Sequence, residues 1–135
     1  MTATATSPRS RPGTVLRLAT AGAQLLAVLV LVQAFLAGRY LFGTWSITVH
    51  GVIGNVVFAL AVVVAGAHTF GRARPSAIVE AWVLVALVTA QIGLGYSSRT
   101  SVDAAAWHIP LGVAAFGLVI HLATRPAVAP EVRPG

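Results

Sequence analysis

Four apolar runs of roughly twenty residues each, separated by short polar segments, constrain the fold of this chain more than any other feature. Charged residues make up 9% of the 135 residues, and the mean hydropathy is +0.86. A soluble domain usually carries about 25% charged residues. Because about 20 apolar residues are enough for a helix to cross ~30 Å of hydrocarbon, the sequence predicts an integral membrane protein.

The ends of the apolar runs predict four transmembrane helices, at about residues 15–40, 46–70, 76–97 and 103–124. Ser76 and Asp103 are placed to cap the third and fourth helices. Residues 1–13 and 126–135 are small, polar or proline-rich, so we expect disordered tails on either side of a transmembrane domain at 14–125. Only helices and closed barrels satisfy their backbone groups in lipid. The short connections therefore predict an all-α, antiparallel, up-down four-helix bundle.

The arginines predict the orientation of this bundle. Two of them, Arg39 and Arg99, fall at one end of the predicted helices, and the others fall at the opposite end: Arg9, Arg11, Arg17, Arg72, Arg74, Arg125 and Arg133. The positive-inside rule then places both termini in the cytoplasm of a bacterial plasma membrane. The net charge of +6 comes from arginines at the ends of the apolar runs, where they set the orientation of the helices and contact the lipid bilayer. No nucleic acid is therefore expected as a partner. The absence of cysteine excludes disulfides, thiolate metal sites, Fe–S clusters and covalently attached haem.

The chain repeats itself after 58 residues. This shift aligns His50 with His108 and, in the same register, the following pairs: Gln33 with Gln91, Gly54 with Gly112, Phe58 with Phe116 and Leu60 with Leu118. Matches of histidine and glutamine are uncommon in so apolar a chain. Each unit of the tandem repeat contains two helices, so the units share one orientation and a pseudo-twofold axis along the membrane normal. Under that symmetry the two histidines face one another at equal depth.

Two symmetric histidines at one depth are suited to be the axial ligands of a planar cofactor. Neutral imidazole is a good ligand for haem iron, and the cores of helix bundles hold such cofactors. Gly54 and Gly112 follow His50 and His108 by four residues, which places each glycine on the same helix face as its histidine. We expect these glycines to leave room for a porphyrin of haem b.

Polar residues near the predicted site supply further contacts. Gln33 and Gln91 each precede a histidine by 17 residues and return to the same half of the membrane. They are predicted either to accept the second ring N–H of the histidine and contact the haem propionates, or to hydrogen-bond across helices as structural residues. Arg39 and Arg99, at the loops of that half, are predicted to neutralise the propionates.

His68 and His121 form a possible weaker second site near the cytoplasmic ends of the second and fourth helices. The 18 residues from His50 to His68 complete five helical turns, which keeps both side chains on one face. The 13 residues from His108 to His121 leave the second side chain about 140° away from the first. We therefore favour one haem, with His68 and His121 as interfacial histidines.

Four segments carry a resemblance to known proteins: QAFLAG (33–38), VHGVIGNVVF (49–58), QIGLGY (91–96) and WHIPLGVAAFGL (107–118). Over about residues 20–125 the chain resembles a family of small four-helix bacterial membrane proteins catalogued as a domain of unknown function. Its layout is also similar to one four-helix half of haem A synthase. That resemblance implies haem b between histidines of the second and fourth helices, which match His50 and His108.

The chain departs from haem A synthase in two respects. Ile47 and Thr48 stand where that enzyme has an acidic residue before the histidine, and one half of the duplicated bundle is present. These departures weigh more against a haem-modifying activity than against haem binding.

These observations leave three classes of function open. A haem with two histidine ligands has no free coordination position, so the first class is electron transfer with a redox partner or quinone, without enzymatic activity of its own. The second is a non-catalytic accessory or uncharacterised membrane subunit whose histidines are structural. The third is a transition-metal or proton relay that uses all four histidines.

The only acids are Glu80, Asp103 and Glu131, which excludes paired carboxylates as a catalytic centre.

Overall fold

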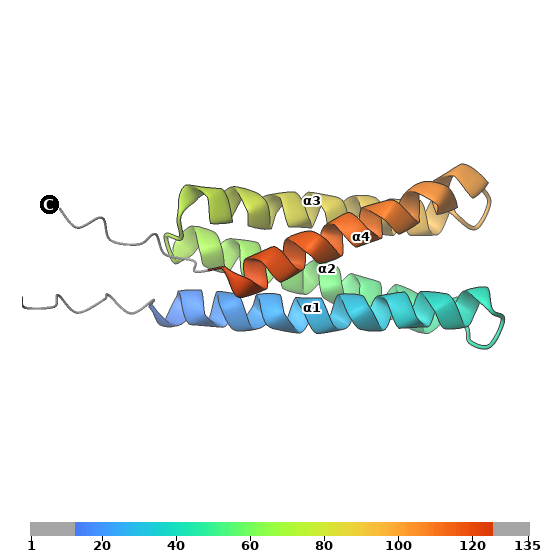
Figure 1. Cartoon of the computed structure of the whole chain (residues 1–135), viewed down its shortest axis with the longest axis horizontal. Coiled ribbons are helices and arrows are strands. Elements are labelled where there is room, and N and C mark those ends of the chain that lie inside the picture. The colour runs from blue at the N-terminus through green and yellow to red at the C-terminus, as the bar shows by residue number, and fades with distance from the viewer. Residues whose placement is uncertain (1–12, 126–135) are drawn as a thin grey trace, which may run out of the picture.

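The structure is a computed structural model, and it describes residues 13–125. Four α-helices account for most of this range: α1 (Thr14–Leu41), α2 (Ile47–Phe70), α3 (Pro75–Ser97) and α4 (Val102–Thr124). Their bounds lie within one residue of the predicted ones. The helices run side by side and alternate in direction (Figure 1). The tails predicted to be disordered, residues 1–13 and 126–135, lie outside the described residues except for Gly13.

The predicted capping residues of the last two helices are wrong. Pro75 occupies the first position of α3, so Ser76 lies inside the helix. Proline is favoured there because its φ is already helical and the N–H that it lacks would have no helical partner. In α4 the cap is Ser101, whose hydroxyl accepts the amide N–H of Ala104 at 3.2 Å. Asp103 instead lies in the first turn, where its charge complements the helix dipole.

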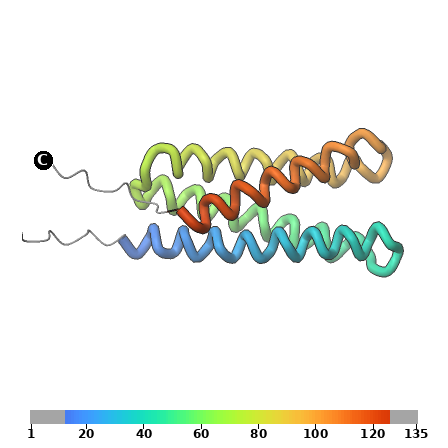
Figure 2. The backbone as a smooth tube through the Cα atoms, in the orientation of Figure 1, coloured from blue at the N-terminus to red at the C-terminus, as the bar shows by residue number. Residues whose placement is uncertain are grey.

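The helices pack in a four-membered ring. In the described residues α1 packs against α2 and α4, and α3 packs against the same two helices. The first hairpin (α1 and α2) and the second hairpin (α3 and α4) therefore lie beside each other, with α2 diagonally opposite α4. The tube in Figure 2 shows the loops of both hairpins at one end, here called the hairpin end. The start of α1, the α2–α3 loop and the end of α4 gather at the other, the terminus end.

All four helices are long and apolar enough to cross a membrane. Large hydrophobic side chains are exposed along their outer faces, including those of Leu18, Phe35, Val63 and Val113. The buried faces instead carry many alanines. Small residues let membrane helices approach closely, and large apolar side chains favour contact with lipid. The fold thus fits a multi-pass membrane protein.

The buried faces of the two hairpins use corresponding positions. Residues Ala19, Ala23, Leu26, Val57, Ala61, Val64 and Ala65 of the first hairpin are buried, and so are the residues 58 positions later, Ala77, Ala81, Leu84, Ala115, Val119, Leu122 and Ala123. Most of these residues belong to one core cluster that runs along the bundle. The same side of each hairpin is therefore turned towards the other hairpin.

Candidate functional site

The structure brings the His50 and His108 rings together across the diagonal of the bundle. Their ring centres are 6.2 Å apart, and their planes are inclined at 60° to each other. Each side chain is half-buried. His50 belongs to α2 and His108 to α4, so the pair joins the two hairpins near the hairpin end.

The first hairpin holds its histidine by a hydrogen bond between helices. Nδ1 of His50 lies 3.2 Å from the backbone carbonyl oxygen of Gln33 in α1. A carbonyl only accepts, so Nδ1 carries the proton and donates it. In the neutral imidazole the other ring nitrogen, Nε2, then has no proton and carries the lone pair that a metal ion would bind.

The second hairpin makes a different bond at the corresponding positions. The side-chain amide Nε2 of Gln91 donates to the backbone carbonyl of His108 at 2.7 Å. Nδ1 of His108 is buried and has no hydrogen-bond partner within residues 13–125. The side-chain oxygen Oε1 of Gln33 is likewise buried and unpaired within that part of the chain. Unpaired buried polar atoms are rare and are expected where a water or another group binds.

Each glutamine also lies against the glycine of its own hairpin. A methyl group added at Gly54 would lie 3.0 Å from Nε2 of Gln33, and one at Gly112 would lie 3.3 Å from Nε2 of Gln91. In this structure the glycines thus make room for the glutamine amides. The expectation from the sequence was that this space would hold a porphyrin. The six residues are here called the histidine layer: Gln33, His50, Gly54, Gln91, His108 and Gly112.

Sequence reasoning missed Gly95. A methyl group at this position in α3 would lie 3.3 Å from Cε1 and 3.8 Å from Nδ1 of the His108 ring. The ring of His108 therefore packs against the backbone of α3. The spacing contained a signal, because Gly95 follows Gln91 by four residues and so shares its helix face.

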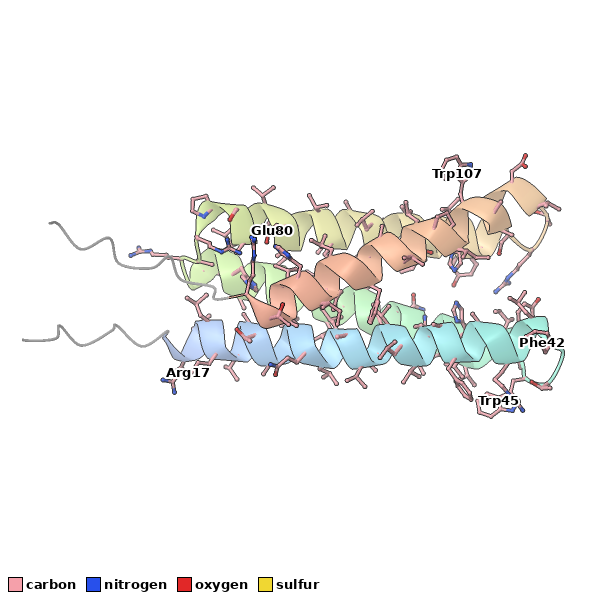
Figure 3. The ribbon with its side chains drawn as sticks, viewed as in Figure 1. Arg17, Phe42, Trp45, Glu80 and Trp107 are labelled. Carbon is pink, nitrogen blue, oxygen red and sulfur yellow. The ribbon has the colours of Figure 1, made fainter. Side chains whose placement is uncertain are left out.

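Arg39 and Arg99 lie at the hairpin end, as expected, but their guanidinium groups contact aromatic rings. Arg39 lies 5.5 Å from the ring centre of Trp45, and Arg99 lies 5.1 Å from that of Tyr96. Both are cation–π contacts at exposed positions. Figure 3 labels Trp45 and Trp107 near this end, where interfacial aromatic residues are expected in a membrane protein.

His68 and His121 have different surroundings at the terminus end. His68 is 2% exposed, and its Nδ1 donates to the carbonyl of Val64 in the same helix at 2.9 Å. Nε2 of His121 lies 3.5 Å from Oε2 of Glu80. Among residues 13–125 no three His, Asp or Glu side chains are grouped to hold a metal ion. The described residues therefore give no support to a metal site that uses all four histidines.

Glu80, near the start of α3, contacts two basic side chains. Its carboxylate lies 3.6 Å from the guanidinium of Arg74 in the α2–α3 loop, and it also contacts His121 of α4. Figure 3 labels Glu80 close to the terminus end. These contacts connect the α2–α3 loop, α3 and α4. They depend on which faces α3 and α4 turn towards each other, and the sequence alone does not specify those faces.

No family model matches the chain, and neither a curated protein nor a solved structure matches it. The function is therefore argued from the side chains of the histidine layer.

Proposed function

We propose that this protein is a small multi-pass membrane protein that binds one b-type haem between His50 and His108 and transfers electrons. The observation that carries the proposal is the 6.2 Å separation of the two ring centres. An imidazole nitrogen binds a metal ion at about 2.0–2.1 Å. The ring centre lies about 1.1 Å behind that nitrogen, so two imidazoles that held one iron ion between them would have their centres about 6.3 Å apart.

The number of protein ligands favours haem over a bare metal ion. A zinc or copper ion usually needs three or four protein ligands. The histidine layer offers two histidines, and the described residues contain no grouping of three ligand side chains. Haem iron needs only two, because the porphyrin supplies the other four nitrogens.

The surrounding residues would orient the two ligands. The carbonyl of Gln33 fixes the tautomer and the plane of the His50 ring, and it increases the basicity of the ligating nitrogen. Gln91 ties the backbone of α4 at His108 to α3. Gly95 lets the His108 ring lie against α3. Haem would supply a one-electron couple at this position, and because His50 and His108 would both hold the iron, the site would favour electron transfer over oxygen activation.

The outer contacts of the haem are part of the same proposal. Arg39 and Arg99 would give up their contacts with Trp45 and Tyr96 and would neutralise the propionates instead. A carboxylate binds a guanidinium group more strongly than an exposed aromatic ring does. Gly54 and Gly112 would border the porphyrin together with the amides of Gln33 and Gln91 that lie against them. A quinone or a second redox protein would exchange the electron.

The proposed topology is a tandem repeat of two hairpins related by a pseudo-twofold axis along the membrane normal. The matching positions of buried residues in the two hairpins support it. The terminus end is placed in the cytoplasm of a bacterial plasma membrane, because Arg17, Arg72, Arg74 and Arg125 lie at that end.

An absorption spectrum of protein purified from haem-replete cells tests the proposal. We expect a b-type α-band after reduction with dithionite, and its loss in His50→Ala and in His108→Ala. His121→Ala is the matched control, since it removes an imidazole at the opposite end of α4 and should keep the band. A colourless wild-type preparation overturns the proposal.

A non-catalytic subunit is the second candidate, and the interhelical hydrogen bonds favour it. The bonds of Gln33 to His50 and of Gln91 to His108 would hold each hairpin together without any cofactor. The double variant His50→Leu/His108→Leu separates the two candidates. Normal partner binding and normal function of this variant favour the non-catalytic subunit, whereas a loss of redox function in a folded variant favours electron transfer.

A further inference from the structure

The two hairpins hold their histidines in different ways, although corresponding residues do so in each. In the first hairpin the backbone carbonyl of Gln33 accepts the Nδ1 proton of His50 at 3.2 Å. In the second hairpin the bond goes to the backbone, since the side-chain amide of Gln91 donates to the carbonyl of His108 at 2.7 Å. The ring of His50 is thus held by the neighbouring helix, whereas in His108 it is the main chain that is held.

The ring of His108 has one nitrogen that is closed off from a metal ion. Nδ1 is buried and has no hydrogen-bond partner within residues 13–125. It lies beside α3, because a methyl group at Gly95 would be 3.8 Å from Nδ1 and 3.3 Å from Cε1. Nε2 is therefore the nitrogen left to bind a metal ion, and in that state Nδ1 carries the proton of the neutral ring. A buried N–H group without an acceptor is unfavourable.

The acceptor at the second ring nitrogen affects how strongly an imidazole holds a metal ion. It fixes the orientation of the ring and raises the basicity of the ligating nitrogen, and its loss typically lowers metal affinity about 10–100-fold. His50 has such an acceptor on a neighbouring helix. His108 has none among the described residues, and a water molecule there would not fix the ring to a helix. The two histidines are therefore unequal ligands, and His108 is the weaker one.

The helical turn that carries His108 also has fewer backbone bonds than the turn that carries His50. Pro110 lies inside α4, two residues after His108. Proline has no N–H, so the carbonyl of Ala106 lacks the helical bond that it would otherwise accept from position 110. The residue 58 positions before Pro110 is Val52, which keeps its N–H. A small movement of the turn around His108 therefore disturbs fewer backbone bonds than the same movement around His50.

We infer that His108 is the displaceable ligand of the histidine layer, and that a small neutral molecule such as carbon monoxide takes its place on the reduced iron. The inference rests on the proposed function, because it concerns the same two histidines. In the exchange the bond between iron and Nε2 of His108 breaks and the bond between iron and carbon monoxide forms, and neither an electron nor a proton is transferred. His50 stays bound. Without such a molecule both histidines hold the iron, as electron transfer requires.

Titration of the dithionite-reduced protein with carbon monoxide, followed by the absorption spectrum, tests the inference. We expect the b-type α-band to be lost and the Soret band to shift to that of a carbon monoxide complex. His121→Ala, at the other end of α4, is the control and should bind carbon monoxide as the wild type does. A b-type spectrum that saturating carbon monoxide leaves unchanged would overturn the inference and leave the proposed function standing. A colourless wild-type preparation overturns both.

Single-histidine variants identify the ligand that leaves. His108→Ala has no ring to displace, whereas the wild type binds carbon monoxide only in the fraction of molecules whose ring has left. Because minor states of this kind are populated at about 0.1–10%, His108→Ala should bind carbon monoxide at least about tenfold more tightly than the wild type.

Haem titration of the two apoproteins compares the ligands directly. His108→Ala should bind haem about 10–100-fold more tightly than His50→Ala, because the ligand that remains in His108→Ala keeps its acceptor. Equal affinities, or a higher affinity for His50→Ala, would overturn the inference. If either variant does not fold, the carbon monoxide titration of the wild type still decides the question.

Discussion

The ring of His108 packs directly against Gly95, where an added methyl group would lie 3.3 Å from Cε1 of the ring. This distance is tighter than most contacts of a real Cβ atom, so the ring of His108 must shift by a few tenths of an ångström to admit a methyl group at position 95. The position of one proposed haem ligand is thus set by a glycine on the neighbouring helix.

Gly95→Ala should weaken haem binding while leaving the protein folded. Overpacking of this kind costs about 1–3 kcal/mol, which corresponds to about a fivefold to hundredfold increase in the haem dissociation constant. Haem titration of the purified apoprotein, followed at the absorption maximum, measures the change. Gly93→Ala is the matched control, since it lies in the same helix and a methyl group there would meet nothing within 4 Å. Equal haem affinities for the two variants would show that the contact with Gly95 does not position His108.

Gln91→Leu should destabilise the bundle more than Gln33→Leu does. The side chain of Gln91 donates to the carbonyl of His108 at 2.7 Å, whereas Oε1 of Gln33 is buried and unpaired within the described residues. Interhelical hydrogen bonds in membranes contribute about 0.6–2 kcal/mol. Unfolding in mixed detergent micelles should therefore give a loss of about 1 kcal/mol for Gln91→Leu and a smaller one for Gln33→Leu. The reverse order would contradict the assigned pairing.

The sequence predicted the helices well because transmembrane helices are specified by local hydropathy. Each apolar run ends where polar or helix-breaking residues begin, and these ends lie within one residue of the observed bounds. The capping residues were predicted less well. Ser76 and Asp103 are both good N-cap residues, but α3 begins one residue before Ser76, with Pro75 in its first position, and Ser101 caps α4. The choice between adjacent candidates depends on loop geometry, which the composition of the loop does not determine.

The closeness of His50 and His108 was predictable because matching residues 58 positions apart supplied long-range information. Local patterns place His50 and His108 on helix faces, but only the repeat relates two helices to each other. The pair of Glu80 and His121 has no counterpart in the first hairpin, where Gly22 and Val63 occupy the corresponding positions. The sequence therefore offered no signal for it.

The contact between Glu80 and His121 should contribute a small coupling energy. The side chains are 22% and 37% exposed, so solvent screens the interaction and the expected coupling is about 0.5–1 kcal/mol. A double-mutant cycle of Glu80→Gln, His121→Gln and the combined variant isolates this energy from the contact of Glu80 with Arg74. Asp103→Asn, at the exposed start of α4, controls for the removal of negative charge. Additive effects of the two substitutions would show that the side chains do not interact in the folded protein.

Gly22→Ala should force α1 and α2 apart. The added methyl group would lie 2.7 Å from Cγ2 of Val64, which is 2% exposed, so a side chain or a helix must shift. We expect a loss of about 1–3 kcal/mol in the free energy of unfolding, measured in mixed detergent micelles. Gly117→Ala is the control in α4, since a methyl group there would meet nothing within 4 Å and a helical alanine is intrinsically favoured over glycine. Val64→Ala removes Cγ2, so Gly22→Ala should cost less in that background than in the wild type. An equal cost in both backgrounds would mean that the loss does not arise from this contact.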